Sequence, residues 1–230
     1  MKENIMSVDR MRQLLDLGCR FPDQQHSLPG EARFERHVKL FSGIDLSSRA
    51  SIGSFSYSWS HISPVIKSIG RYCSIAHSIS FGEFEHPIDR FTTSAITFDY
   101  GMFEEAAFGT NYRTQGFSED SRFFKQIEIG HDVWIGSGAY VRAGVKLGTG
   151  CIIGGRSIVT KDVPPYAVVV GNPGRIIKYR FDEKTIERLL KSEWWKYKFT
   201  DFVDIDFRKI EQFLELIESG NLKVFDEIFF

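Results

Sequence analysis

A histidine with carboxylates on both sides is the residue of this sequence best suited to acid–base chemistry. His86 lies in the stretch GEFEHPIDRF, with Glu83 and Glu85 before it and Asp89 after it. An imidazole can accept a proton from a substrate close to neutral pH, because its pKa is ordinarily about 6.5. One of the carboxylates, or equally a backbone carbonyl, can orient the ring. The residues alone are also compatible with an ordinary histidine on a surface loop.

The composition restricts the class of protein to which this histidine belongs. The chain has 230 residues, of which 42% are hydrophobic and 26% charged, as in an ordinary soluble globular protein. Its formal net charge of −1 provides no basic field for nucleic acid. Residues 1–30 contain no signal-peptide core, and no run of about 18 apolar residues could span a membrane. We therefore expect a cytoplasmic protein.

A period of six residues runs through residues 127–173 and must determine where the candidate residues lie. Every sixth residue is aliphatic: Ile129, Ile135, Val141, Leu147, Ile153 and Val159. A small or β-branched residue recurs four positions after each of them, and glycine often follows directly. This period is typical of a solenoid, in which three sides of six residues close a coil of about 18 residues. Conventional sandwich strands alternate with period two and vary in spacing, so they fit poorly.

The same period appears earlier, with interruptions. Hexads begin at Leu46, Ile52, Ile69 and Ile75, whereas residues 58–68 fit poorly. Residues 82–126, which contain His86, break the pattern completely. They must leave the solenoid as an excursion, and long excursions of this kind are usually functional.

Three regions follow from these patterns. We predict an N-terminal extension packed on the body (residues 1–43), a repetitive body (44–180) and a C-terminal helical region (181–230). Helical spacing occurs in residues 7–17, 181–197 and 206–220, with Asp182 as an N-cap and Gly220 as a C-terminal stop. We expect the C-terminal helices to cover the open strand edges of the last coil.

The other histidines and the cysteines are weaker candidates for chemistry. His61 lies in the irregular stretch and can reach an acceptor pocket, whereas His77 and His131 are expected at corners, solvated or at an interface. His26 and His37 lie in no motif. The three cysteines form no CxxC pair and no even-numbered framework, which argues against a disulfide scaffold or a Cys-based zinc site: Cys19, Cys73 and Cys151.

The stretch IGHDVWIGSGAYVRAGVKLGTGCIIGGRSIVTKDVPPYAVVVGNPGRIIKYRF resembles the hexapeptide-repeat acyltransferases. Within them it is most similar to the xenobiotic and polysaccharide O-acetyltransferase branch, which includes chloramphenicol and streptogramin acetyltransferases. The resemblance covers residues 44–197 and rests on the VWIG, VTKD-PP and GNP elements. It implies a left-handed parallel β-helix, a homotrimer with sites between subunits, and transfer from acetyl-CoA without a metal. The left hand is implied by the resemblance alone, since crossovers in general are right-handed.

The resemblance also implies roles for particular residues. It places His86 as the general base for direct attack on the thioester, and a backbone N–H near Ser137 or Gly138 as the oxyanion donor. The basic residues among the cofactor contacts suit the phosphates of coenzyme A, although a solvated basic rim would account for them as well. The cofactor-binding residues implied are Trp134, Ser137, Gly138, Gly155, Thr160, Lys161, Arg175 and Lys178.

The acceptor is the least constrained part of this interpretation. The residues HPIDRFTTSAITF resemble enzymes of surface-polysaccharide gene clusters more than the antibiotic acetyltransferases. We therefore expect a sugar hydroxyl as acceptor, with an antibiotic hydroxyl or a sugar amine as alternatives. A zinc-dependent, carbonic-anhydrase-like protein or a scaffold β-helix is a further alternative from another class. The absence of a suitable histidine constellation and the presence of VTKD-PP both count against it.

Overall fold

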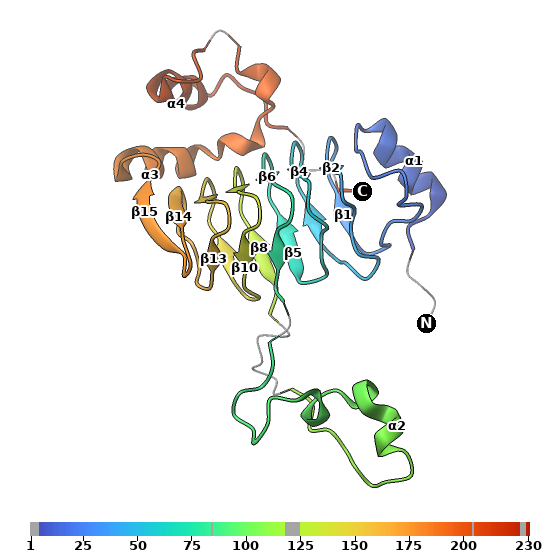
Figure 1. Ribbon diagram of the computed structural model, residues 1–230. Helices are drawn as coiled ribbons and strands as arrows, with labels where there is room; N and C mark the ends of the chain where they lie inside the picture. Colours follow the sequence, from blue (N-terminus) through green and yellow to red (C-terminus); the bar gives the residue numbers. More distant parts are fainter. Residues whose placement is uncertain (1–4, 84, 118–124, 204, 226–228) are drawn as a thin grey trace.

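The body of the protein is a stack of short parallel strands arranged in three sheets (Figure 1). The computed structural model describes residues 5–83, 85–117, 125–203, 205–225 and 229–230. Sheet 1 contains β1 (Arg33–Phe34), β3 (Ser51–Ile52), β5 (Ile66–Ile69), β8 (Ile127–Ile129) and β11 (Lys146–Leu147). Sheet 2 contains β2 (Lys39–Leu40), β4 (Tyr57–Ser58), β6 (Ser74–Ile75), β9 (Trp134–Ile135), β12 (Ile152–Ile153), β14 (Ala167–Val170) and β15 (Arg175–Tyr179). Sheet 3 contains β7 (Ser80–Phe81), β10 (Tyr140–Val141) and β13 (Ile158–Val159).

The register of these strands follows the predicted repeat. Trp134 pairs with Ile152 and Tyr140 pairs with Ile158, so one coil takes 18 residues and visits all three sheets. The aliphatic residue of each hexad from Ile129 to Val159 is at most 3% exposed. The small residues four positions later, among them Cys151, are buried as well. The period of six is therefore the period of the core, as predicted.

The stack begins earlier than the sequence suggested. Strands β1 and β2 precede residue 44, yet they pair in parallel with β3 and β4 of the same sheets. The predicted hexad at Leu46 is wrong, because Leu46 is 44% exposed and Ile44, which is 2% exposed, points into the core instead. Ahead of the strands, helix α1 (Val8–Asp16) occupies the predicted helical stretch, with Ser7 as its N-cap.

The described residues of the segment 82–126, which are 82–83, 85–117 and 125–126, leave the stack between β7 and β8, as predicted, and form an arm that projects from it (Figure 1). The arm contains η1 (Ala95–Thr97), η2 (Tyr100–Phe103) and α2 (Glu104–Ala107). Strands β7 and β10 still pair across the excursion, with Ser80 beside Tyr140. The inserted residues therefore leave the coils on either side in contact.

The C-terminal region contains both predicted helices, α3 (Glu183–Ser192) and α4 (Ile210–Glu218), with the short turns η4 (Trp194–Lys196) and η5 (Phe199–Asp201) between them. Asp182 caps α3, since its carboxylate accepts a hydrogen bond from the Thr185 N–H at 3.0 Å. In sheet 2 the last edge is covered by the antiparallel strand β15, which was not predicted, rather than by a helix. No helix of the described part of the chain is long and apolar enough to cross a membrane.

The chain after α3 runs back along the corner between sheets 1 and 2, toward the first coil. Trp195 stacks on His131, with ring centroids 4.7 Å apart. At the far end, Phe230 exchanges two backbone hydrogen bonds of 2.9 Å with Phe34 of β1. This C-terminal strap, which comprises the described residues 193–203, 205–225 and 229–230, therefore connects the last coil to the first.

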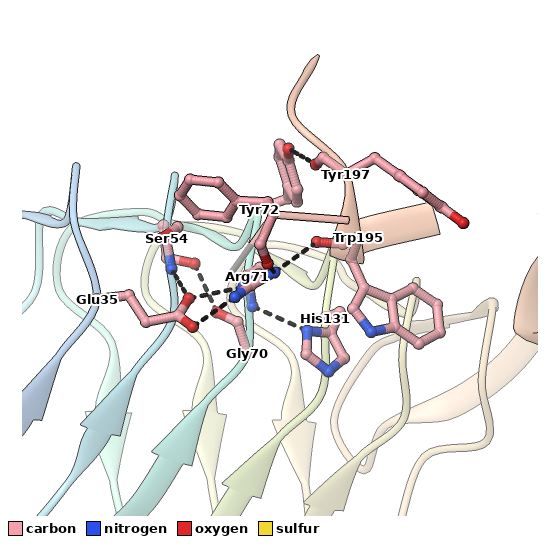
Figure 2. Close-up of polar contacts among 10 residues, drawn as sticks. Glu35, Ser54, Gly70, Arg71, Tyr72, His131, Trp195 and Tyr197 are labelled. Atoms are coloured by element: carbon pink, nitrogen blue, oxygen red, sulfur yellow. Dashed lines mark hydrogen bonds and ion pairs between the residues drawn. The ribbon is translucent and has the colours of Figure 1, made fainter. Parts of the chain in front are cut away.

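A buried ion pair fastens the strap to the stack (Figure 2). Arg71 donates to both carboxylate oxygens of Glu35, at 2.7 and 2.6 Å, and the two side chains are 2% and 3% exposed. The Ser54 N–H donates to the same carboxylate at 2.7 Å. The second terminal nitrogen of Arg71 donates to the carbonyls of Trp195 and Phe225, at 3.3 and 3.4 Å. One guanidinium thus joins two coils and two points of the strap.

Candidate active site

The imidazole of His86 lies at the root of the arm, exposed to solvent. Its Nδ1 is 2.7 Å from the carbonyl oxygen of Thr93. A carbonyl can only accept, so Nδ1 carries the proton and the lone pair of the neutral ring lies on Nε2. The edge of the ring packs against Phe98, with centroids 5.0 Å apart. A backbone carbonyl therefore orients the ring, one of the two possibilities that the sequence left open.

Two of the carboxylates beside His86 connect the arm to the stack instead. Glu85 forms a two-pronged pair with Arg142, at 2.5 and 2.7 Å, and this hydrogen bond raises the pKa of the guanidinium. Glu83 accepts a hydrogen bond from the hydroxyl of Ser80, the first residue of β7. Both contacts fix the direction in which the arm leaves sheet 3. The sequence contained no sign that Arg142 would take part.

Several predicted cofactor residues meet at the corner between sheets 2 and 3. The hydroxyl of Ser137 is 3.2 Å from Nδ1 of His77 in the neighbouring coil, and the Gly138 N–H donates to the His77 carbonyl at 3.2 Å. Gly155 follows in the next coil, where an added Cβ would lie 3.1 Å from the Ser137 carbonyl oxygen. Of the two predicted oxyanion donors, only the Ser137 N–H has no hydrogen-bond acceptor among the described residues.

The outer face of sheet 2 carries three more of the predicted residues. Trp134 is 54% exposed and its ring lies outside the stack, as predicted, although it begins strand β9 on a flat side and not at a corner. Lys178 lies in the same row across the sheet, through the pairs Trp134–Ile152, Ile152–Val168 and Val168–Lys178. Arg175 begins β15 and donates to the carbonyl of Gly174 at 3.0 Å.

Thr160 and Lys161 lie at the corner between sheets 3 and 1, after β13. One coil away, the backbone N–H of Arg142 donates to the carbonyl of Val159 at 2.9 Å, so this is also the corner from which the arm leaves. Within one chain the predicted residues therefore fall into separate groups. The arm root and Thr160 lie at the corner between sheets 3 and 1, where the strands of sheet 3 end. Ser137 and Gly155 lie at the corner between sheets 2 and 3, where these strands begin.

Burial removes the cysteines and one histidine from the list of reactive groups. Cys73 and Cys151 are fully buried in the core, and this burial raises the pKa of both thiols to about 12. Their thiolates are therefore not available as nucleophiles near neutral pH. His131, which was expected at a corner, either solvated or at an interface, is covered by Trp195 of the same chain, and burial lowers its pKa to about 4. In the described residues, no group of three or more His, Cys, Asp or Glu side chains could hold a metal ion.

Known proteins resemble both the repeat and the larger part of this chain. Residues 126–161 match the family described as bacterial transferase hexapeptide (six repeats). A chloramphenicol acetyltransferase of Klebsiella aerogenes is 40% identical over 157 residues, which are 67% of this chain and 67% of that protein. A probable macrolide acetyltransferase of Lysinibacillus sphaericus is 36% identical over 138 residues, 59% of this chain and 72% of that protein. The structure of a galactoside acetyltransferase in complex with coenzyme A is similar with a TM-score of 0.41 and 25% identity, over 66% of this chain and 70% of that one.

The similarity to the Klebsiella protein extends well beyond residues 126–161, since it takes in two thirds of each chain. It is supported by the three-sided coils and by the glycine-rich corner at Ser137 and Gly155. The chain therefore belongs to the hexapeptide-repeat transferase family and, within it, to the group of acetyl-CoA-dependent acetyltransferases that includes the chloramphenicol acetyltransferases.

Proposed function

We propose that this protein transfers the acetyl group of acetyl-CoA to a hydroxyl group, with His86 as the general base. The observation that carries the proposal is the hydrogen bond from Nδ1 to the Thr93 carbonyl, because it holds the tautomer that a base requires. Nε2 takes the proton of the acceptor hydroxyl, whose oxygen bonds to the thioester carbonyl carbon. The carbon–sulfur bond then breaks, and the imidazolium returns the proton to the departing sulfur.

The sheet 2–3 corner is suited to the acyl group and to the arm of coenzyme A. The Ser137 N–H can donate to the oxygen that becomes negative in the tetrahedral intermediate. Gly155 is exposed and has no side chain, so a narrow chain can lie close to the backbone there. Lys161, Arg175 and Lys178 are exposed cations that suit the phosphate groups. These assignments follow the resemblance of the sequence to the family.

The assembly we propose is a homotrimer of left-handed parallel β-helices with the sites between subunits. Support comes from the separation of the proposed base and oxyanion donor within one chain. The arm root and the Ser137 corner lie at opposite ends of the strands of sheet 3. A neighbouring subunit can bring its own Ser137 corner to the arm. Light scattering at micromolar concentration tests this, and a monomer that retains full activity would contradict shared sites.

Two classes of acceptor are supported by different observations. The relatives named for chloramphenicol and macrolides favour an antibiotic-like alcohol. The residues after His86, HPIDRFTTSAITF, favour a sugar hydroxyl instead. The exposed apolar side chains of the arm, Ile88, Phe91 and Phe108, are 90%, 94% and 85% exposed and can contact either kind of molecule or a second subunit.

The test is acceptor-dependent release of free thiol from acetyl-CoA, with chloramphenicol, simple sugars and nucleotide-linked sugars as acceptors. Loss of a general base should lower the rate in His86→Ala by about a hundredfold or more. His26→Ala is the matched control, because His26 is also exposed and lies away from the arm. The acceptor that drives thiol release identifies the class. Transfer that survives in His86→Ala would overturn the assignment of the base.

A further inference from the structure

A cavity lies at the corner between sheets 1 and 2, beside the first coils. Its volume is about 760 Å³, and it is lined by the segment after α1, by strands β2 and β4 and by the C-terminal strap. This corner lies opposite sheet 3. The proposed base and oxyanion donor lie at the two ends of the strands of sheet 3, away from this corner. Along sheet 2, β2 is separated from Trp134 of β9 by three strand spacings, roughly 14 Å. The cavity is therefore separate from the proposed acetyl-transfer site.

The described residues that line this cavity include four cations and no carboxylate. Arg20 is held by hydrogen bonds to two backbone carbonyls. Arg36, Lys39 and Lys198 form no ion pair with any carboxylate of the described chain. His37 also lines the cavity and lies among these charges. Its pKa is lowered by burial first, and then by the charges of Arg36, Lys198 and Lys39.

Aromatic rings form much of the remaining surface. Phe225 holds two of the cations in place, since Arg36 and Lys198 lie over its ring at 5.1 and 5.3 Å from the centroid. Phe41 and Tyr57 line the cavity and are each 39% exposed. The cavity therefore offers flat apolar surface beside cations that no described carboxylate pairs.

We propose that this cavity binds a nucleotide that carries at least two phosphate groups. The phosphates are bound by Arg36, Lys39 and Lys198, and the base stacks on the exposed rings of Phe41 and Tyr57. A nucleoside diphosphate has a charge of about −3 at neutral pH. Arg36, Lys39 and Lys198, which no described carboxylate pairs, suffice to balance it. The volume lies within the range of about 300–1,000 Å³ that small-molecule sites have. An apolar ligand would leave the cations uncompensated, and a bare anion would leave the rings unused.

The proposal is independent of the proposed acetyl transfer, because no residue is shared between the two sites. Isothermal titration of the full chain with uridine diphosphate and adenosine diphosphate tests it. Each titration is done with and without saturating coenzyme A, since that molecule contains a nucleotide of its own. The variant is the double change Lys39→Gln with Lys198→Gln. Its control is Lys184→Gln with Lys191→Gln, which removes the same charge from exposed positions of α3.

We expect binding of at least one diphosphate, unchanged by coenzyme A and weakened about tenfold or more in the cavity variant but not in the control. Phe41→Leu should weaken binding of the nucleotide and leave that of inorganic diphosphate unchanged. Acetyl transfer should be retained in all of these variants, so failure here is distinct from failure of the His86 assignment. Thermal unfolding of each variant checks that it remains folded.

Four results would overturn the proposal. They are the absence of nucleotide binding at millimolar concentration, binding that the cavity variant leaves intact, competition by coenzyme A, and equal affinity for inorganic diphosphate.

Discussion

Replacement of Glu35 by glutamine should remove a large part of the stability of the protein. The carboxylate accepts three hydrogen bonds, two from Arg71 and one from the Ser54 N–H, and it is 3% exposed. Oε2 of Glu35 accepts from both the Ser54 N–H and Nε of Arg71, and Oε1 accepts from Nη2 of Arg71. If the glutamine oxygen takes the position of Oε2, its NH₂ group faces Nη2, which is also a donor. The guanidinium, 2% exposed, also loses its counter-charge. Breaking one partner of a buried pair costs about 3–5 kcal/mol.

Urea unfolding followed by circular dichroism measures this loss. Wild type and variants must be compared at one protein concentration, because the stability of the proposed homotrimer would depend on it. For a chain of this size the same loss lowers the melting temperature by about 6–20 °C, at 2–4 °C for each kcal/mol. The control is Arg49→Gln, whose pair with Glu31 has side chains 73% and 45% exposed. Exposed pairs contribute about 0–1 kcal/mol, so the control should change little.

A loss in Glu35→Gln no larger than that of the control would refute the reasoning, since it would mean that water reaches the pair. The double variant Glu35→Leu with Arg71→Met provides a second check. Both charges are then removed together, so it should be less destabilised than Glu35→Gln alone. If the double variant is less stable than Glu35→Gln, the loss of stability comes from the hydrogen bonds between Arg71 and the strap carbonyls rather than from the unpaired charge.

Three further predictions concern pH, packing and the arm. Burial lowers the pKa of His131 to about 4 in the folded chain, whereas the unfolded chain binds the proton near pH 6.5. The stability that the neutral imidazole contributes is therefore present above about pH 6.5 and is lost as pH falls toward 4. In His131→Asn, the free energy of unfolding in urea should depend less steeply on pH across this range. Gly70→Ala would place a Cβ 2.5 Å from a carbonyl oxygen of the next coil and should cost about 1–3 kcal/mol or more in thermal unfolding, whereas Gly101→Ala meets only ordinary contacts and should not. Glu85→Gln removes the charge that pairs with Arg142 and should lower the rate of thiol release while folding is retained; an unchanged rate would show that this pair does not position the base.

The repeat was predictable because each of its positions depends on nearby sequence alone. An aliphatic residue such as Ile135 points into the core since its neighbours in the coil fix the direction of a two-residue strand. The early start of the stack carried the same signal, because Phe34 and Leu40 are one period apart and both are buried. The exposed Leu46 obscured it, since an aliphatic residue in step with the period need not face inward.

The strap and its ion pair were not predictable, because their partners are far apart in the sequence and follow no period. Glu35 and Arg71 lie in different coils, and the strap carbonyls they support come from residues 195 and 225. Strand β15 has five exposed residues, so it lacked the alternation that marks a half-buried strand. The orientation of His86 by a carbonyl was likewise invisible, since any residue at position 93 provides the same acceptor.

The division of the candidate site between two ends of sheet 3 follows from the geometry of the coil itself. Residues that begin and end a strand of this sheet, such as Ser137 before β10 and Arg142 after it, must lie at different corners whatever their chemistry. A base on an arm from one corner and a donor at the other can act together only if the arm folds back or if a second copy supplies the missing corner. The arm projects from the stack, with Glu85 fixed to Arg142, so the second arrangement requires less rearrangement of the chain (Figure 1). Mixing His86→Ala subunits with subunits altered at the Ser137 corner, for example Gly155→Val, tests this directly. Shared sites should regain activity in the mixed oligomer, and sites within one chain should not.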